Sequence, residues 1–343
     1  MTSGPRVDGE FLPPGKIPID VLEATVLKMT GARSPDIVTP PKAGLDFSAL
    51  KLKNGFMIIS ADPITGVSSE IGRYAIMVSS NDVATSGNRP QFAETVVLLP
   101  QGSQRGDVAK VARQMDGAAK EAGIAIVGGH TEVTPGLLRP IVMATVFSFV
   151  KEYVSSGDAE EGDTIMMTKT AGLEGTAALA REYGDSGKRF SRSTVNRAGR
   201  FLERLSVIDD AEAAFKTGHV HAMHDCTEGG VLGASYEMSF ASGVGFELEE
   251  SLVPVAPETR AICQSLRLDP LKLIGSGSLL IAVRKGKEAQ LKEALTDICG
   301  VTSVGRFTKR ERVLIHPDRS ETKVRAAPED ELWRALGRRG DRH

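Results

Sequence analysis

Segments with the periodicity of strands alternate along this chain with segments of helical periodicity, and this alternation limits the fold more than any other feature of the sequence. Apolar runs and amphipathic segments succeed one another in both halves. The strands expected from this pattern are 56–61, 92–99, 124–127, 140–150, 164–168, 219–223, 279–283 and 301–306. The expected helices are 19–31, 71–84, 107–121, 176–182, 195–204, 229–239 and 288–298. Both α/β and α+β folds fit such an order, and the pattern alone leaves the choice open.

The chain is longer than a single hydrophobic core usually supports. It has 343 residues, and cores stop growing at about 250–300 residues. The segment 151–163 is polar and loop-like, as domain linkers are. We therefore expect two domains, 1–155 and 156–343.

Charge and cysteine usage exclude several classes of protein. The net charge is −2, which argues against a broad nucleic-acid-binding surface; the Arg-rich end, 333–343, is expected to be a solvated terminus. The three cysteines are far apart and form no C-x-x-C pair, so we expect a reducing, cytoplasmic location without disulfides. No apolar leader is present in 1–15, and the longest apolar run, 140–150, is too short to cross a membrane.

Four carboxylates in the first half lie beside turn residues or at the ends of apolar segments. They are Asp46, Asp62, Asp82 and Glu132. Each alone is more typical of a cap or a turn than of a metal ligand. Together they predict a rim of hard oxygen ligands, which favours Mg²⁺ over zinc because no cysteine accompanies them.

The stretch "IVGGHTEV" (126–133) has three interpretations: a zinc site, a phosphate cradle or a tight turn between strands. A zinc deaminase would need a downstream P-C-x-x-C, and the chain has none. Gly128 and Gly129 allow positive φ and close approach of the backbone to a phosphate. The phosphate and turn interpretations both stay open, as does the role of His130.

A second glycine pair, Gly229-Gly230, lies within "HDCTEGGVLGA" (224–234), at the start of an expected helix. Thr227 is expected to cap this helix, whose free N–H groups suit an anion. Plain capping and packing explain the stretch equally well. Cys226 is expected to be a buried structural thiol, since no activating base accompanies it.

The order of these motifs resembles the aminoimidazole ribonucleotide synthetase-related superfamily, over about residues 16–310. The motifs are "GKIP", "GLDFSAL", "SADPIT", "NDVATSGNRP", "VGGHTEV", "HDCTEGGVLGA" and "GSGSLLIAV". The resemblance implies a two-domain α+β fold. Its N-terminal domain would pair with that of a second subunit in a barrel-like core, making a homodimer, and its C-terminal domain would be α/β.

The resemblance also implies a site for ATP and Mg²⁺ between domains and subunits. Its implied metal ligands are Asp46, Asp62, Asp82 and Glu132. Its implied nucleotide-binding residues are Lys16, Asn81, Gly128, Gly129 and Thr131. Its implied catalytic and substrate-side residues are Asp82, Asp225 and Thr227.

Among the superfamily, "GKIP", "DPIT" and "GGHTEV" are most similar to HypE-related hydrogenase maturation proteins. HypE ends in a cysteine that receives a carbamoyl group, whereas this sequence ends "LGRRGDRH". We therefore predict an ATP-dependent enzyme that activates a small substrate, or a group on a carrier protein, by phosphoryl transfer. The alternatives are a nucleotide-binding partner protein without catalysis and a kinase of the thiamine-monophosphate type.

Overall fold

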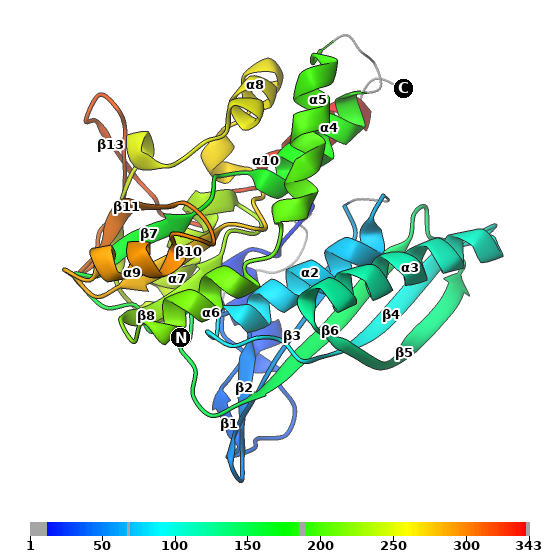
Figure 1. Cartoon of the computed structure of the whole chain (residues 1–343), viewed down its shortest axis with the longest axis horizontal. Helices are drawn as coiled ribbons and strands as arrows, with labels where there is room; N and C mark the ends of the chain where they lie inside the picture. The colour runs from blue at the N-terminus through cyan, green and yellow to red at the C-terminus, as the bar shows by residue number, and fades with distance from the viewer. Residues whose placement is uncertain (1–11, 67–68, 185–188, 341–343) are drawn as a thin grey trace, which may run out of the picture.

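The structure is a computed structural model that describes residues 12–66, 69–184 and 189–340. Two β-sheets lie side by side, with helices packed against each (Figure 1). This mixed arrangement confirms the expected α+β class, and the chain passes from the first sheet to the second after β6. Among the described residues, no helix is long and apolar enough to cross a membrane.

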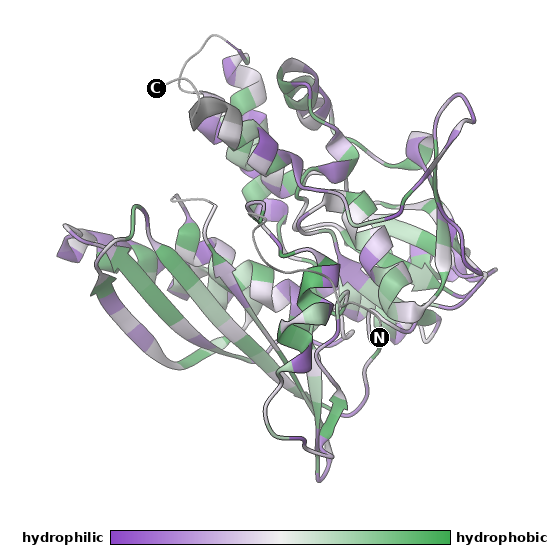
Figure 2. Cartoon of the chain, turned by 180° about the vertical axis from the view of Figure 1, so that it is seen from behind, coloured by the Kyte–Doolittle hydropathy of each residue, from purple (hydrophilic) through white to green (hydrophobic). Residues whose placement is uncertain are grey.

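The first sheet has six strands in the order β1-β2-β3-β6-β4-β5, antiparallel except for the parallel pair β4 and β5. Its strands are β1 (Ile37–Thr39), β2 (Ser48–Leu52), β3 (Gly55–Ile64), β4 (Phe92–Pro100), β5 (Ala125–Thr134) and β6 (Ile141–Val150). Helices α2 (Ile71–Ala84) and α3 (Arg105–Ala122) cover one face. The other face, seen in Figure 2, carries no helix over its broad part and is largely hydrophobic. The described strands form an open sheet, not a closed barrel.

The second sheet has seven strands in the order β13-β12-β9-β11-β7-β10-β8, and only β12 and β9 are parallel. Its strands are β7 (Thr164–Thr168), β8 (Val220–Asp225), β9 (Gly245–Glu249), β10 (Leu279–Val283), β11 (Val301–Thr308), β12 (Arg312–Ile315) and β13 (Glu321–Lys323).

The remaining helices include one near the start of the chain and seven after β6. They are α1 (Ile19–Ala24), α4 (Leu173–Gly184), α5 (Arg192–Gly199), α6 (Ile208–Lys216), α7 (Gly230–Ser242), α8 (Pro257–Leu266), α9 (Glu288–Leu295) and α10 (Glu331–Gly340). Short 3₁₀ helices span Val26–Lys28, Arg200–Arg204, Glu250–Leu252 and Pro270–Lys272.

Strand β10 shows how the second sheet is buried on both faces. All five of its residues are buried. Leu279, Ile281 and Val283 belong to a core shared with α2, α3, α6 and α9, whereas Leu280 and Ala282 face the core under α7. This division follows the two-residue period of a strand, and it explains why the sequence here reads as a continuous apolar run.

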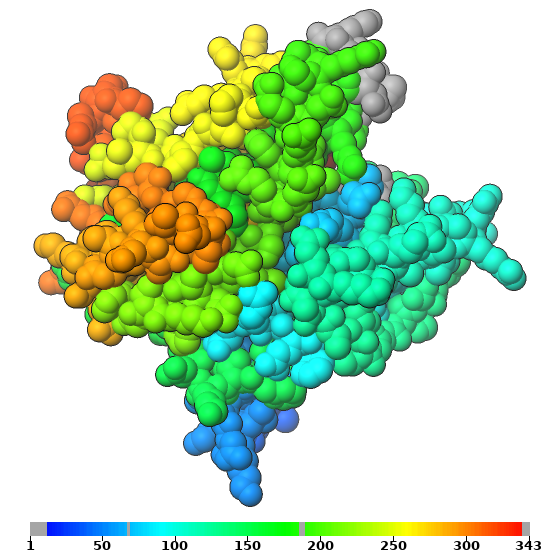
Figure 3. Space-filling model, in the orientation of Figure 1, coloured from blue at the N-terminus to red at the C-terminus, as the bar shows by residue number. Residues whose placement is uncertain are grey.

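The two halves of the chain form one packed body (Figure 3). Asn81 of α2 joins them, because its Nδ2 donates to the Leu205 carbonyl at 2.7 Å and its Oδ1 accepts from the Val207 N–H at 3.0 Å. The side chain is fully buried. With both ends of this amide used, the seam between the sheets is fixed next to Asp82.

Strand β5 differs from its prediction. The glycine pair does not make a turn, because Gly128 and Gly129 lie inside a ten-residue strand that begins at Ala125. Gly129 has a φ of +151°, and a Cβ there would lie 2.0 Å from the Thr95 carbonyl oxygen. Glycine is therefore needed at position 129 so that β5 can pair closely with β4.

Three other expectations change in the N-terminal part. The helix expected over 19–31 ends at Ala24 and is followed by a 3₁₀ turn. The Pro-rich segment 35–44, which the sequence predicts to be a loop, contains β1. Strand β3 continues to Ile64, so Asp62 lies within the strand and not at its end.

Candidate active site

A cluster of acidic side chains lies at the seam between the two sheets. Asp46 precedes β2, Asp62 lies in β3, Asp82 lies in the last turn of α2 and Asp225 ends β8. We call these four residues the acid cluster. Burial raises the pKa of Asp82, and Asp62, Asp225 and Asp46 raise it further, so the four carboxyls lie near one another. Four of the sequence-predicted site residues therefore converge.

His224 and Glu237 complete one side of the acid cluster. The His224 Nε2 lies 3.1 Å from Asp46 Oδ1 and 3.2 Å from Glu237 Oε2. Its Nδ1 lies 2.7 Å from the Asp225 carbonyl oxygen. Burial disfavours the charged ring, but Asp46 and Glu237 outweigh burial and raise the pKa of His224 to about 9. The imidazole is thus a buried cation at neutral pH.

Glu237 lies on α7 and links His224 to the N-terminal segment. The Lys16 Nζ lies 3.2 Å from both of its carboxylate oxygens. Although burial opposes it, Lys16 and His224 together lower the pKa of Glu237 to about 2. The Lys16 Nζ also donates to Thr227 Oγ1 at 3.4 Å. Lys16 and Thr227 therefore meet at the acid cluster, as predicted for residues of one site.

On the opposite side Asp225 and Asp82 lack a close ion pair in the described part of the chain, since the His224 Nδ1 lies 4.0 Å from Asp225 Oδ1 and no ion pair involves Asp82. The Asp225 carboxyl is 1% exposed, and within the described part of the chain neither of its oxygens has a hydrogen-bond partner. Burial and the neighbouring Asp46 raise its pKa well above the usual range. Asp82 accepts one hydrogen bond, from Ser60 Oγ at 2.7 Å, and Asp46 accepts one from Ser156 Oγ at 2.9 Å. Buried carboxyls left in this state indicate a missing positive partner.

A divalent cation fits this donor set. Asp46 and Asp225 each offer a carboxylate oxygen, and these atoms lie within 4.8 Å of each other, beside His224. Carboxylate oxygens dominate the surroundings, which suits Mg²⁺. A bound cation would also give the two unpartnered oxygens of Asp225 a positive partner. The residues present therefore fit the metal that the sequence predicted.

The loop after β8 owes its shape to glycine. Gly229 is the N-cap of α7 with a φ of +82°, and its N–H donates to Asp330 Oδ2 at 2.7 Å. A Cβ on Gly230, whose φ is +61°, would lie 2.6 Å from the Leu271 carbonyl oxygen. The prediction that Thr227 caps α7 was wrong, because this helix has no side-chain cap. Cys226 is fully buried, and its raised thiol pKa agrees with a structural role.

The remaining predicted residues lie away from the acid cluster. Gly128, Gly129, Thr131 and Glu132 are exposed on edge strand β5. There the Glu132 carboxylate pairs with His130 Nε2 at 3.1 Å and accepts from Thr134 Oγ1 at 2.7 Å. Asn81 adjoins Asp82 in sequence, but its amide is bound between Leu205 and Val207. A single chain therefore brings Lys16 to the acid cluster, but not the predicted nucleotide-binding residues of β5.

Sequence reasoning did not assign a role to His224 or to Glu237. The signal for Glu237 was present, because it is the single charged residue of α7, whose other residues are apolar, small or neutral. It also lies seven residues after Gly230, on the helix face that passes the end of β8. A lone charge in an otherwise uncharged, buried helix indicates a partner in the interior.

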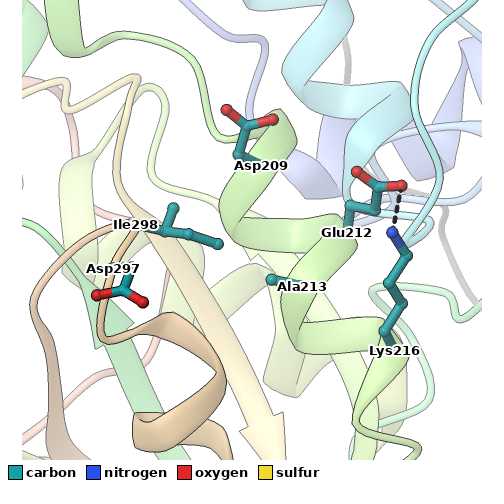
Figure 4. A pocket seen from close by; sticks show the side chains of 6 residues that line it. All are labelled: Asp209, Glu212, Ala213, Lys216, Asp297 and Ile298. Carbon is teal, nitrogen blue, oxygen red and sulfur yellow. Dashed lines mark hydrogen bonds and ion pairs between the residues drawn. The ribbon is translucent and has the colours of Figure 1, made fainter.

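A surface pocket elsewhere on the molecule is a poorer candidate (Figure 4). Its lining residues are Asp209, Glu212, Ala213, Lys216, Asp297 and Ile298. Arg89 pairs with Asp209 at 2.6 Å and with Glu212 at 3.0 Å, and Lys216 pairs with Glu212 at 2.7 Å. Because these contacts already satisfy Asp209 and Glu212, this pocket lacks the unpartnered oxygens of the acid cluster.

Comparison with known proteins agrees with this geometry. Residues 46–150 match the N-terminal domain of AIR synthase related proteins, and residues 160–316 match the C-terminal domain. The chain belongs to the AIR synthase related family. A carbamoyl dehydratase HypE of Escherichia coli is 29% identical over 265 residues, which cover 74% of this chain and 76% of that protein. A putative hydrogenase expression/formation protein of Methanocaldococcus jannaschii is 28% identical over 237 residues, 68% of each chain.

Solved structures share the fold. A HypE–HypF complex superposes with a TM-score of 0.73 at 20% identity, covering 89% of this chain and 99% of the other. A ThiL structure complexed with AMPPCP and TMP gives a TM-score of 0.69 at 20% identity, covering 90% and 94%. At these identities the likeness concerns the fold alone.

Proposed function

We propose that this family member is an Mg²⁺-dependent enzyme that uses ATP to activate a small substrate, or a group on a carrier protein, by phosphoryl transfer. The observation that carries the proposal is the acid cluster, where Asp225 keeps two buried oxygens without partners. The existence of a HypE structure in complex with ATP and of a ThiL structure with a nucleotide analogue supports it.

In this proposal Asp46 and Asp225 hold Mg²⁺ together with Asp62 and Asp82. The ion supplies charge neutralisation for the transferring phosphoryl group. Protonated His224 keeps the Asp46 carboxylate in place through their 3.1 Å contact. Lys16, whose side chain is half-exposed, holds the N-terminal segment against Glu237 and presents a positive charge at the mouth of the acid cluster.

We further propose that a second copy of the chain completes the nucleotide site. Strand β5 carries Gly128, Gly129, Thr131 and Glu132 on an exposed edge. The large apolar residues exposed on β5 and β6 are Ile126, Val127, Val133 and Phe149. An apolar sheet face with an unpaired edge is typical of an interface. A homodimer through this face would bury it and bring Glu132 from one copy toward the nucleotide of the other.

Two alternative functions are each supported by a solved structure of similar fold. The HypE–HypF complex supports a protein partner that carries the substrate group. The ThiL structure with TMP supports a small-molecule kinase. A partner protein that binds ATP without turning it over is the third possibility.

The test measures ATP binding by calorimetry and phosphate release, with and without Mg²⁺, in wild type, Asp62→Ala and Asp82→Ala. We expect phosphate release to fall at least about 100-fold in both variants, since each loses a carboxylate at the metal. Asp116→Ala, on the exposed face of α3, is the matched control and keeps wild-type rates. Unchanged hydrolysis in both cluster variants would refute the proposal, and tight binding without turnover would favour the partner protein.

A further inference from the structure

Buried polar atoms without partners gather at one edge of the second sheet. Within the described residues they belong to Thr170, Glu174, His224, Asp225 and Ser276. Strand β10 lies between β7 and β8 and is antiparallel to both. The carboxyl ends of β7 and β8 and the start of β10 therefore meet at the same edge, where these five residues lie. Since buried polar groups are normally satisfied, their concentration marks a ligand site.

These atoms form two groups. Asp225 belongs to the acid cluster, and His224 lies beside it with its Nε2 in ion pairs with Asp46 and Glu237. Thr170, Glu174 and Ser276 form a second group that the proposed metal and nucleotide do not use. We call this second group the Glu174 subsite. Its side chains come from the segment between β7 and α4, from the first turn of α4 and from the loop 274–278.

The Glu174 subsite is joined directly to the loop that carries Asp225. The Gly275 N–H donates to the Cys226 carbonyl at 2.8 Å, and the Cys226 N–H donates to the Ser278 carbonyl at 2.9 Å. The Ser278 Oγ donates to the Thr170 carbonyl at 2.6 Å. Three loops are thus held together by short hydrogen bonds, which places the two groups side by side on a rigid frame.

The chemistry of the Glu174 subsite is that of an acceptor. Glu174 is 6% exposed and its Oε2 has no partner, while Ser276, fully buried, faces the carboxyl with its hydroxyl. Burial raises the pKa of Glu174 to about 7, with Asp330 and Glu228 adding to the rise. No lysine or arginine in the described ranges forms an ion pair with Glu174. The carboxyls of Glu174, Asp330 and Glu228 disfavour an anion here. An apolar group would leave the buried polar atoms without hydrogen-bond partners.

We propose that Glu174, with Ser276 and Thr170, binds a cationic nitrogen group of the substrate, such as an ammonium or guanidinium, while another part of that substrate is activated at the acid cluster. This proposal rests on the proposed function for the second half of the statement. The carboxylate accepts hydrogen bonds from the N–H donors, and the two hydroxyls provide further acceptors. The Glu174 subsite and Asp225 of the acid cluster are then held next to each other by the hydrogen bonds between these three loops.

The test uses methylguanidinium and its neutral analogue of similar shape, methylurea, as probes in saturation-transfer NMR with wild type, Glu174→Gln and Ser276→Ala. We expect methylguanidinium to bind wild type and to bind Glu174→Gln at least about tenfold more weakly. Methylurea should bind wild type more weakly than methylguanidinium does. Equal binding of methylguanidinium to wild type and Glu174→Gln, or equal binding of the two probes to wild type, would overturn the proposal.

A second measurement separates this proposal from the proposed function. Calorimetry with Mg-ATP should give the same affinity for wild type and Glu174→Gln, because the variant leaves the acid cluster intact. A loss of Mg-ATP affinity in Glu174→Gln would overturn the assignment of a separate subsite. If wild type binds no Mg-ATP, the proposed function fails while the methylguanidinium comparison still decides the role of Glu174. If Glu174→Gln does not fold, Ser276→Ala replaces it in both measurements, and the same outcomes support or overturn the proposal.

Discussion

The acid cluster and strand β5 each contain a histidine beside carboxylates, but the two regions place them in opposite surroundings. His224 has a side chain 2% exposed and touches Asp46 and Glu237, whereas His130 has a side chain 64% exposed and touches Glu132. In the interior, charges that are not fully paired shift pKa values strongly and call for a ligand. On the surface, water screens the same pair and leaves it with little energetic weight.

The difference shows that a histidine–carboxylate pair in a sequence says little until its burial is known. "GGHTEV" and "HDCTEGG" look equally suited to a site as sequences. Only the second lies in the interior of a single chain, and the first would have to be covered by another copy to gain comparable weight. The following predictions test this contrast, beginning with the largest effect.

Replacing the two histidines separates the regions most clearly. His224→Ala leaves Asp46 and Glu237 buried without their shared cation, so we expect the free energy of unfolding to fall by about 3 kcal/mol. His130→Ala should change it by less than about 0.5 kcal/mol. Urea unfolding followed by circular dichroism measures both. Similar effects in the two variants would contradict the contrast.

A charge on β5 should break the proposed dimer. Val127 is 58% exposed on the uncovered sheet, and Val127→Arg places an unpaired charge in the proposed interface. We expect the dimer dissociation constant to rise at least about 100-fold, or about 2.7 kcal/mol. Analytical ultracentrifugation measures this constant. Ile298→Arg serves as control, because Ile298 is exposed at the surface pocket that residues of α6 also line. A wild-type protein that is monomeric at all concentrations would refute the proposed dimer through the β5 face.

The stability of the ligand-free protein should depend on pH through Glu174. Its pKa is raised to about 7 in the folded state from a usual value of 4.5, so its contribution is favourable at low pH and is lost as the pH rises through about 7. Because glutamine does not titrate, Glu174→Gln does not lose stability in this way as the pH rises. We expect the variant to gain about 3 kcal/mol relative to wild type between pH 4.5 and pH 8, since a rise of one pKa unit corresponds to about 1.4 kcal/mol.

Thermal or urea unfolding across this pH range tests the expectation. Glu293→Gln, on the exposed face of α9, is a matched control that should follow wild type throughout. A constant difference between Glu174→Gln and wild type from pH 4.5 to pH 8 would show that Glu174 does not titrate near neutrality.

Long periodic segments of the fold could be predicted from the sequence. Helix α2 spans the residues that its apolar content indicated, and β10 forms where the run "LLIAV" predicted a buried strand. Strand β5 could not be predicted in full, because two glycines read as a turn when their partner strand is unknown. Only the close approach to Thr95 shows that Gly129 serves strand pairing.

For the site, the sequence supplied the residues and the fold supplied their grouping. Asp46, Asp62, Asp82 and Asp225 stood out because they adjoin turns and strand ends. Asn81 lies next to Asp82 and looks equally suitable, yet its amide partners lie more than 120 positions away. Glu174 carried no motif at all, and its interest arises from burial and an unpartnered oxygen, which no linear pattern records.

The central claim is that the acid cluster holds the divalent cation. Crystals soaked with Mn²⁺ and a non-hydrolysable ATP analogue test it through the anomalous difference map. We predict a peak within coordination distance of Asp46 and Asp225, beside His224. A peak confined to Glu132 on β5 or to the pocket of Asp209 and Glu212, with none at the acid cluster, would contradict the account.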